Sequence, residues 1–225
     1  MKSLNELKEM HGEEYVKSYR HQKPMRLERL LKYMAIDSTF TVADFACGNG
    51  MLMEYIAPKV KSYIGIDFSE PFIKEANEKK KLLSIKNADF VCSDINEFCL
   101  HHQNTFDVGF AMDFSEHVYD KEWAQMLGSI RKSIKPNGKL YIHTPNAEFF
   151  LEKMKSKNFI FKQYPQHIGI RTPEQNASIL REAGFSVTQL RLIPHYKILR
   201  LFHPLSHIPV FGKYFKARIF IEATK

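Results

Sequence analysis

The sequence predicts an α/β protein whose core is a doubly wound, mostly parallel sheet. Short apolar runs alternate along the chain with segments whose apolar residues recur at helical spacing. This alternation is typical of strands joined by crossover helices, which parallel pairing requires. Glycines or aspartates end the first four runs, at the edge where such sheets bind their ligands.

Seven apolar runs are the predicted strands: residues 40–46, 60–66, 88–92, 106–112, 139–143, 185–192 and 218–223. Helices are expected at residues 51–57, 69–83, 121–134 and 172–184, and over most of residues 1–35. Ser69 and Thr172 are predicted helix caps, and Gln175 completes a capping box with Thr172. Residues 136–138, Pro-Asn-Gly, predict a turn, and residues 146–170 show no clean period.

Composition excludes several classes of protein. The net charge of +8 invites a nucleic-acid interpretation, but the basic residues are scattered and the 225 residues leave little room for an RNA-binding module. No apolar run reaches the roughly 18 residues of a membrane span, and the first residues lack the pattern of a signal peptide. A cytoplasmic protein is therefore expected.

Cysteine and histidine spacing argues against a metal or disulfide scaffold. Cys47, Cys92 and Cys99 are too few for a disulfide framework and lack the spacing of a zinc site, which suggests a reducing compartment. The adjacent His101 and His102 have no third ligand in view. We expect no metal cofactor.

The turn after the first strand predicts a site for a small ligand. Gly48 and Gly50 let the backbone turn sharply and approach a ligand closely. A dinucleotide fingerprint would need a third glycine where Met53 stands, and no Lys-Ser or Lys-Thr pair follows as in a phosphate-binding loop. Asp67, at the end of the second strand, can accept both ribose hydroxyls, and Asp94 can accept from an adenine amino group. A nucleoside without phosphates, bound in such a sheet, indicates S-adenosylmethionine.

Six segments resemble the class I S-adenosylmethionine-dependent methyltransferases, within them the small-molecule branch related to the quinone O-methyltransferases. They follow the family's order across residues 38–190: VADFACGNG (42–50), YIGIDFS (63–69), ADFVCSDI (88–95), FDVGFAMDFSEHV (106–118), SIKPNGKLYIHTPN (133–146) and HIGIRTPEQNASILREAGF (167–185). The resemblance implies a Rossmann-like, seven-stranded, mostly parallel sheet with its last strand antiparallel and helices on both faces. One departure is Ala46, where the family more often has glycine.

The resemblance also implies the cofactor-binding residues. They lie at the ends of the first four strands: Asp44, Ala46, Gly48, Gly50, Asp67, Phe68, Ser93, Asp94, Ile95, Asp113 and His117. Asp44, Ala46, Gly48 and Gly50 would border the methionine part of the cofactor. Asp67 would bind the ribose with Phe68 packing near the adenine, and Asp94 and Ile95 would flank the adenine. Asp113 and His117 would lie beside the sulfonium and the mouth of the substrate pocket.

We expect one methyltransferase domain over residues 1–225. Residues 1–37 would form an N-terminal helical cover and 38–145 the cofactor-binding core. Residues 146–171 would be an insertion that covers the substrate, and 172–225 a C-terminal helix and strands.

Methyl transfer from a sulfonium is an in-line displacement in which the leaving thioether needs no acid. A hydroxyl nucleophile also needs a general base, and histidine suits that role near neutral pH. His117, His143 and His167 lie at the expected mouth of the site as candidate catalytic residues. The last two, with Tyr15 and Tyr19, are also candidate substrate contacts.

Several of these assignments have a structural alternative. Asp94 can simply cap the following helix, and His117 can contact the cofactor without moving protons. His143 can be a hydrogen-bonded core histidine, and His167 can hold its own loop in place. The two tyrosines can belong to a helix that packs on the sheet.

Residues 191–218 interleave basic with apolar and aromatic side chains, and their three prolines prevent one long helix. The stretch is expected to join the last two strands. The simpler interpretation is a wall of the substrate pocket. The alternatives are contact with an anionic membrane surface or with an anionic or lipid-linked substrate.

The predicted function is methylation of a small molecule by S-adenosylmethionine, at oxygen rather than nitrogen or carbon, with S-adenosylhomocysteine as product. Residues 112–115, Met-Asp-Phe-Ser, replace the Asn/Asp-Pro-Pro-Tyr/Phe of enzymes that methylate bases, which disfavours nucleic acid. Two alternatives stay open: an RNA or protein methyltransferase, and a non-catalytic cofactor-binding protein of the same fold. Met53 argues against a nicotinamide enzyme.

Overall fold

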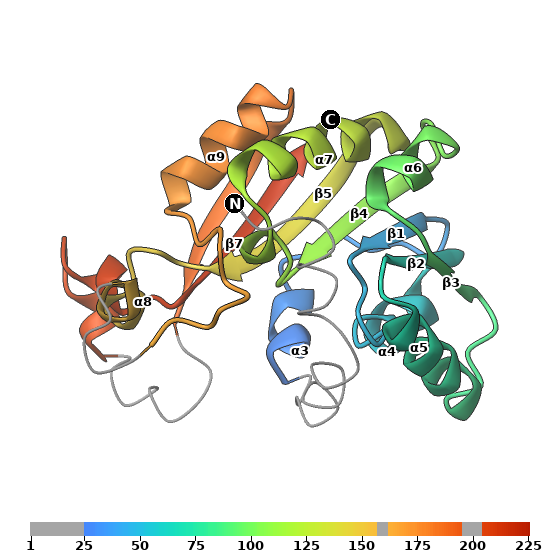
Figure 1. The fold of residues 1–225 in the computed structure, drawn as a ribbon, viewed down its shortest axis with the longest axis horizontal. Helices are drawn as coiled ribbons and strands as arrows, with labels where there is room; N and C mark the ends of the chain where they lie inside the picture. The colour runs from blue at the N-terminus through green and yellow to red at the C-terminus, as the bar shows by residue number, and fades with distance from the viewer. Residues whose placement is uncertain (1–24, 157–161, 195–203) are drawn as a thin grey trace.

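The computed structural model describes residues 25–156, 162–194 and 204–225. They contain one seven-stranded sheet in the order β3-β2-β1-β4-β5-β7-β6. The strands are β1 (Thr41–Phe45), β2 (Ser62–Asp67), β3 (Ala88–Cys92), β4 (Phe106–Met112), β5 (Ile134–Pro145), β6 (Ser186–Ile193) and β7 (Arg218–Thr224). The first five pair in parallel, whereas β7 runs antiparallel to β5 and β6 (Figure 1). The predicted doubly wound sheet and its antiparallel last strand are confirmed.

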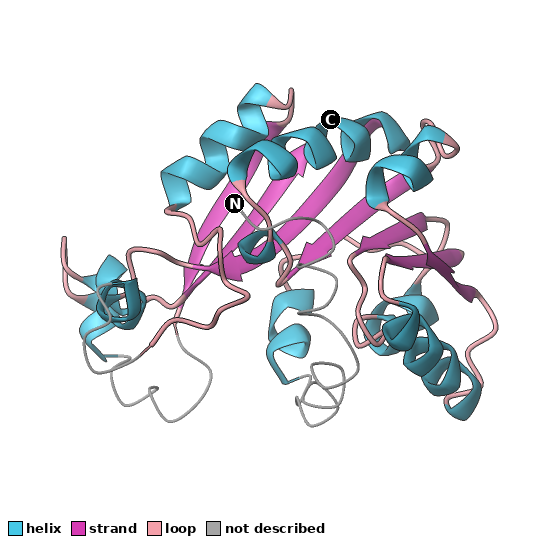
Figure 2. Ribbon diagram, viewed as in Figure 1, coloured by secondary structure: helices cyan, strands magenta, loops and turns pink. Residues whose placement is uncertain are grey.

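Helices cover both faces of the sheet (Figure 2). One face carries α3 (Met25–Leu31), α4 (Met53–Ile56) and α5 (Glu70–Leu82), and the other carries α6 (Ile95–Leu100), α7 (Asp120–Ser133) and α9 (Pro173–Glu182). Apolar side chains alternate along the strands and so enter two cores. Phe45 packs with Trp123 in the core beneath α6, α7 and α9, and Phe110 packs with Phe220 in the core beneath α3 and α4.

Of the two predicted helix caps, Thr172 is confirmed with its side-chain bonds, and Ser69 is confirmed in position only. At the start of α9, the Gln175 N–H donates to Thr172 Oγ1 at 3.2 Å, and the Thr172 N–H donates to Gln175 Oε1 at 2.8 Å. Ser69 occupies the N-cap of α5, but its side chain makes no capping hydrogen bond. The Asp67 carboxylate instead accepts the Ser69 N–H at 2.9 Å, because Asp67 ends β2 directly beside it.

Two other expectations are corrected. Residues 136–138 are not a separate turn but the irregular first part of β5. Asn137 takes a left-handed φ of 63° there, and the pairing with β4 shifts register between Ile134 and Lys139, as at a β-bulge. Residues 146–170, expected to be irregular, contain α8 (Phe150–Ser156). Its Phe150 ring packs 5.5 Å from the ring of Phe215, a contact that local periodicity cannot report.

Helix length bears on the question of a membrane span. Within the described ranges, every helix is too short or too polar to cross a bilayer.

Candidate active site

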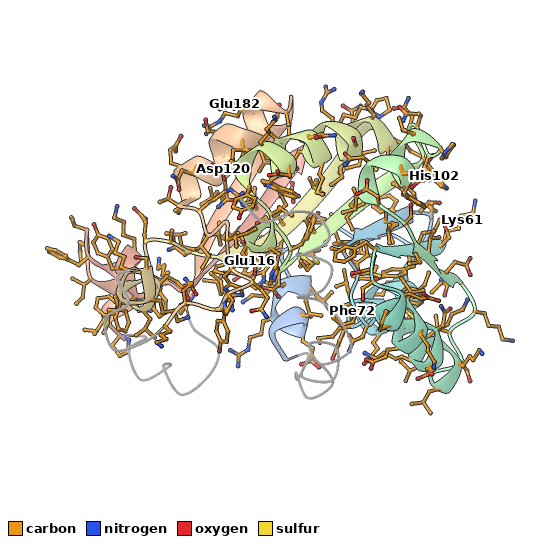
Figure 3. All side chains as sticks on the ribbon, in the orientation of Figure 1. Lys61, Phe72, His102, Glu116, Asp120 and Glu182 are labelled. Atoms are coloured by element: carbon orange, nitrogen blue, oxygen red, sulfur yellow. The ribbon has the colours of Figure 1, made fainter. Side chains whose placement is uncertain are left out.

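The carboxyl ends of β1, β2 and β4 bring predicted site residues together. β1 pairs with β2 on one side and with β4 on the other. Asp44, Asp67 and Asp113 therefore lie at or just beyond the ends of neighbouring strands. Glu116, labelled in Figure 3, lies at this same edge of the sheet, beyond the end of β4.

The loop after β1 contains three residues with a left-handed backbone. Ala46, Gly48 and Gly50 have φ values of 59°, 53° and 69°. A Cβ on Gly50 would lie 2.8 Å from a ring carbon of Phe90, so a side chain there would force a shift. A Cβ on Gly48 would meet nothing within 4 Å, so a ligand can come close to the backbone at that point.

Asp67 ties this loop to the end of β2. Its Oδ2 accepts the Gly48 N–H at 3.0 Å, and its Oδ1 accepts the Ser69 N–H at 2.9 Å. Burial raises the pKa of Asp67 to about 6, against the lowering effect of these backbone hydrogen bonds. The group is therefore mostly ionised at pH 7. A carboxylate offers about four acceptor sites, so beside its backbone hydrogen bonds from Ser69, Gly48 and Phe68 it can still accept from a hydroxyl donor. This chemistry fits the predicted contact with a ribose.

Two buried acceptors lie at the end of β1 and in the loop that follows it. Asp44 is 2% exposed and accepts a hydrogen bond from the Tyr63 hydroxyl. Burial raises the pKa of Asp44 to about 7, although the Tyr63 bond acts in the opposite direction. Asn49 Oδ1 is buried and has no hydrogen-bond partner within the described part of the chain. An acceptor left in this state suits a ligand that brings a donor such as an amino group.

The residues predicted to flank an adenine follow β2 and β3. Phe68 is 38% exposed, whereas Ile95 is buried. Asp94 caps α6, because its Oδ1 accepts backbone N–H groups of the first helical turn at 2.7 and 3.3 Å. The Ser93 hydroxyl donates to the Asp94 carbonyl at 3.1 Å. The capping alternative for Asp94 is thus present, and its contact with an adenine stays a prediction.

The end of β4 carries a network of charged groups. Asp113 takes a left-handed φ of 52°, and its Oδ1 lies 2.9 Å from His143 Nδ1 and 3.6 Å from Arg218 Nη1. His143 is fully buried. A general base must reach the acceptor, so a fully buried His143 held against Asp113 fits the core-histidine alternative better.

Glu116 is a candidate proton-exchanging residue of the site that the sequence did not predict. It is 2% exposed, Thr144 Oγ1 donates to its Oε2 at 3.1 Å, and Ser115 Oγ in turn donates to Thr144 Oγ1 at 2.9 Å. Burial, reinforced by the negative charge of Asp113, raises the pKa of Glu116 to about 7. A carboxyl group with this pKa can gain or lose a proton near neutral pH. Its only signal in the sequence is its place directly before His117.

His117 and His167 meet at the mouth of this network. Their ring centroids lie 5.1 Å apart and the rings are nearly perpendicular. His117 Nδ1 lies 3.1 Å from the Gln166 carbonyl oxygen, which makes Nδ1 the protonated nitrogen and Nε2 the acceptor. His167 Nδ1 is buried and has no hydrogen-bond partner within the described ranges. Burial lowers the pKa of both rings, that of His167 to about 4, so both are neutral at pH 7.

Glu116, His117 and His167 together form a candidate metal-binding group. Each offers one ligand atom, and these atoms lie within 4.8 Å of one another. Two neutral imidazoles and a carboxylate suit Zn²⁺ or another transition metal. The expectation of no metal rested on the cysteine spacing and on His101 and His102, and it overlooked this group because His167 is distant in the sequence.

Arg171 holds the segment 166–171 against the site. It is 3% exposed, and its guanidinium donates to three backbone carbonyls at 2.7–2.8 Å and to Asp120 Oδ1 at 2.7 Å. The Gly169 N–H also donates to the Glu116 carbonyl at 2.9 Å. These contacts place His167 beside the residues that follow β4.

Tyr15 and Tyr19, the other predicted substrate contacts, lie outside the described residues. Their role stays a prediction.

Comparison with known proteins gives a family match and similar enzymes. The methyltransferase domain family matches residues 36–184. A ubiquinone biosynthesis O-methyltransferase of Coxiella burnetii is 29% identical over 151 residues, 64% of this chain, and the chain spans 63% of that protein's length. The protein of the same name from Saccharophagus degradans is 25% identical over 193 residues, 78% of this chain and 80% of that one. The solved structure of a SAM dependent methyltransferase from Archaeoglobus fulgidus has a TM-score of 0.72 at 20% identity, covering 94% of this chain and 98% of that one.

Proposed function

The chain belongs to the methyltransferase domain family, within the class I S-adenosylmethionine-dependent methyltransferases, and we propose that it methylates an oxygen atom of a small molecule. S-adenosylmethionine is the proposed cofactor and S-adenosylhomocysteine the product. The observation that carries the proposal is the 3.0 Å hydrogen bond from the Gly48 N–H to Asp67 Oδ2. It joins the loop after β1, where a ligand can come close to the backbone, to the carboxylate proposed to accept the ribose hydroxyls. The names of the two relatives, both O-methyltransferases, support oxygen as the acceptor atom.

Different residues of the site are proposed to bind the cofactor and to place the acceptor. S-adenosylmethionine, when bound, supplies an electrophilic methyl group on a sulfonium that departs as a neutral thioether. Asp67 would hold the ribose, and the backbone at Gly48 would border the methionine part. The chain must also hold the acceptor oxygen in line, about 3 Å from the methyl carbon.

We assign the general base to His117. Its Nδ1 is engaged by the Gln166 carbonyl, so Nε2 is the nitrogen that takes the proton of an acceptor hydroxyl. His167, with a pKa of about 4, is a weaker base at neutral pH and is assigned to substrate contact. His143 is buried against Asp113.

Metal ligation is a second assignment for the same residues, favoured by the 4.8 Å grouping of Glu116, His117 and His167. A bound cation would lower the pKa of the acceptor hydroxyl directly. Dialysis against a chelator separates the two assignments. An unchanged rate supports base catalysis, and a lost rate that Zn²⁺ restores supports a metal.

The acceptor class and the cellular location are also proposals. Arg218 lies 3.6 Å from Asp113 beside the proposed mouth, which suits an anionic or lipid-linked acceptor. None of the three cysteines is in a disulfide, in keeping with a cytoplasmic location.

The test is S-adenosylhomocysteine production with pooled hydroxylated metabolites and quinone precursors, with RNA and protein as comparison acceptors. The wild-type protein is expected to turn over a small molecule. His117→Gln is expected to lower the rate by about 10²–10⁴-fold, the usual contribution of a general base. The matched control is His102→Gln, because His102 stacks on Phe98 in α6, away from Glu116 (Figure 3).

The pH profile gives a second readout. His117 must be neutral to accept a proton, and burial lowers its pKa below the ordinary 6.5. The wild-type rate should therefore rise with pH and level off below about pH 6.5, and His117→Gln should lack that step. A His117→Gln protein with the wild-type rate and profile would exclude this base, and turnover of RNA alone would exclude the small acceptor.

A further inference from the structure

The segment between β6 and β7 ends in an exposed apolar tip, residues 208–211. Ile208, Val210 and Phe211 are 43%, 81% and 61% exposed, with Pro209 between them. Other strongly exposed apolar side chains lie at the ends of helices: Leu82 at 83% with its neighbour Leu83 at 44% after α5, and Leu100 alone at 67% in α6. Three exposed apolar side chains within four residues are therefore a local feature and not the general character of this surface.

The tip is a tight turn that keeps these side chains outward. The Gly212 N–H donates to the Ile208 carbonyl at 2.8 Å. A Cβ on Gly212 would lie 2.4 Å from the Ser206 carbonyl oxygen, so the turn closes only with glycine there. Val210 takes a left-handed φ of 65°, which is rare for a β-branched residue. This strained backbone at the most exposed residue is a feature that tends to occur at binding surfaces.

The tip is attached to the body of the protein through η4 (Gly212–Phe215), the 3₁₀ turn that follows it. The Phe215 ring packs 5.5 Å from Phe150 of α8, and Lys153 Nζ lies 4.4 Å above the Tyr214 ring. In Figure 1 this segment, in red, lies beside α8 at the outer edge of the molecule. The apolar side chains therefore project from a packed support.

The charged residues on either side of the tip in the sequence are all basic. Residues 183–221 contain no Asp or Glu. The Lys and Arg residues of this stretch are Arg191, Lys197, Arg200, Lys213, Lys216 and Arg218. Lys213 is exposed and pairs with Glu148 at 3.1 Å. The stretch is thus suited to a partner that is apolar inside and anionic at its surface.

We propose that residues 208–211 insert into the surface of an anionic lipid membrane, with the neighbouring lysines at the level of the headgroups. Apolar insertion combined with basic residues gives reversible, salt-sensitive binding of this kind. The tip connects to the edge of the sheet that holds the proposed active site, since β5 ends at Pro145 and β7 begins beside it at Arg218. Membrane binding by the tip does not depend on the proposed methyl transfer.

The test is co-sedimentation of the full chain with phosphatidylcholine vesicles, with and without phosphatidylglycerol. The wild-type protein should bind the anionic vesicles more tightly than the neutral ones, and added salt should weaken this binding. Val210→Ser/Phe211→Ser should bind at least about tenfold more weakly, because the apolar area that enters the interface is lost. The matched control is Leu82→Ser/Leu100→Ser, which removes equally exposed apolar side chains elsewhere and should bind as the wild type does.

Three results would overturn the proposal. They are a wild-type chain that does not bind anionic vesicles, equal loss of binding in both double variants, and a wild-type dimer that only Val210→Ser/Phe211→Ser dissociates. The last result, seen by analytical ultracentrifugation, would assign the tip to a second copy of the chain. S-adenosylmethionine calorimetry on the same variants should give the wild-type affinity, which separates a failure at the tip from a failure of the proposed cofactor site.

Discussion

Single residues decide how closely a ligand can approach the loop after β1. Gly48 and Gly50 take left-handed conformations, and the space beside Gly48 is open. Ala46 takes the same conformation with φ 59°, which costs a residue with a Cβ about 1–2 kcal/mol. This cost gives a physical reason for glycine to be the more frequent residue at position 46 in the resembling family.

Ala46→Gly is expected to raise the free energy of unfolding by about 0.5–1 kcal/mol. The relief of the left-handed conformation exceeds the extra entropy that glycine gives the unfolded chain. The measurement is urea unfolding at equilibrium. Ala43→Gly, in the buried β1 strand, is the control and should instead lower stability, because it removes a packed methyl group from an extended backbone. Equal losses in both variants would contradict the strain at Ala46.

At the scale of elements, Arg171 joins three pieces of chain. Its guanidinium bonds connect the residues before α9 with the turn after β4 and with Asp120 at the start of α7. The Gly169 N–H also donates to the Glu116 carbonyl. Together these hydrogen bonds fix where the His167 ring packs against the His117 ring. One buried cation therefore supports the whole mouth of the proposed site.

Arg171→Lys is expected to lower the free energy of unfolding by about 2–4 kcal/mol, since an ammonium cannot reproduce the forked set of hydrogen bonds and leaves carbonyls unsatisfied. The KM for the acceptor should rise, while the affinity for S-adenosylmethionine should change little. Arg181→Lys is the control, because Arg181 is 57% exposed and its ion pair is with the exposed Glu174 in α9. Two variants of equal stability would show that Arg171 has no such role.

Local chemistry explains which elements the sequence predicts. The start of α9 follows from Thr172, Pro173 and Gln175, whose capping bonds form within the segment itself. α8 and the irregular start of β5 do not follow, because they depend on contacts with η4 and with β4. Residues that act through partners distant in the sequence leave no periodic trace.

The same distinction holds at the scale of the whole molecule. A parallel sheet aligns the carboxyl ends of its strands, so Gly48, Asp67 and Asp113 could be assigned to one edge from their positions alone. The proximity of Glu116 and His167 could not be predicted from the sequence, because it arises only where residues 166–171 fold back across the end of β4. The raised pKa of Glu116 likewise arises from burial, which sequence spacing does not report.

The central claim is that the edge formed by β1 and β2 binds S-adenosylmethionine through Asp67. Isothermal titration calorimetry at pH 7.5 tests it most directly, with wild type, Asp67→Asn and the control Asp89→Asn, whose side chain is 79% exposed on β3. Loss of charge-assisted hydrogen bonds to the ribose should weaken binding by about tenfold to hundredfold in Asp67→Asn and leave the control unchanged. Thermal unfolding without ligand checks that each variant is folded. A wild-type protein that does not bind S-adenosylmethionine, or a folded Asp67→Asn that binds it with wild-type affinity, would contradict the claim.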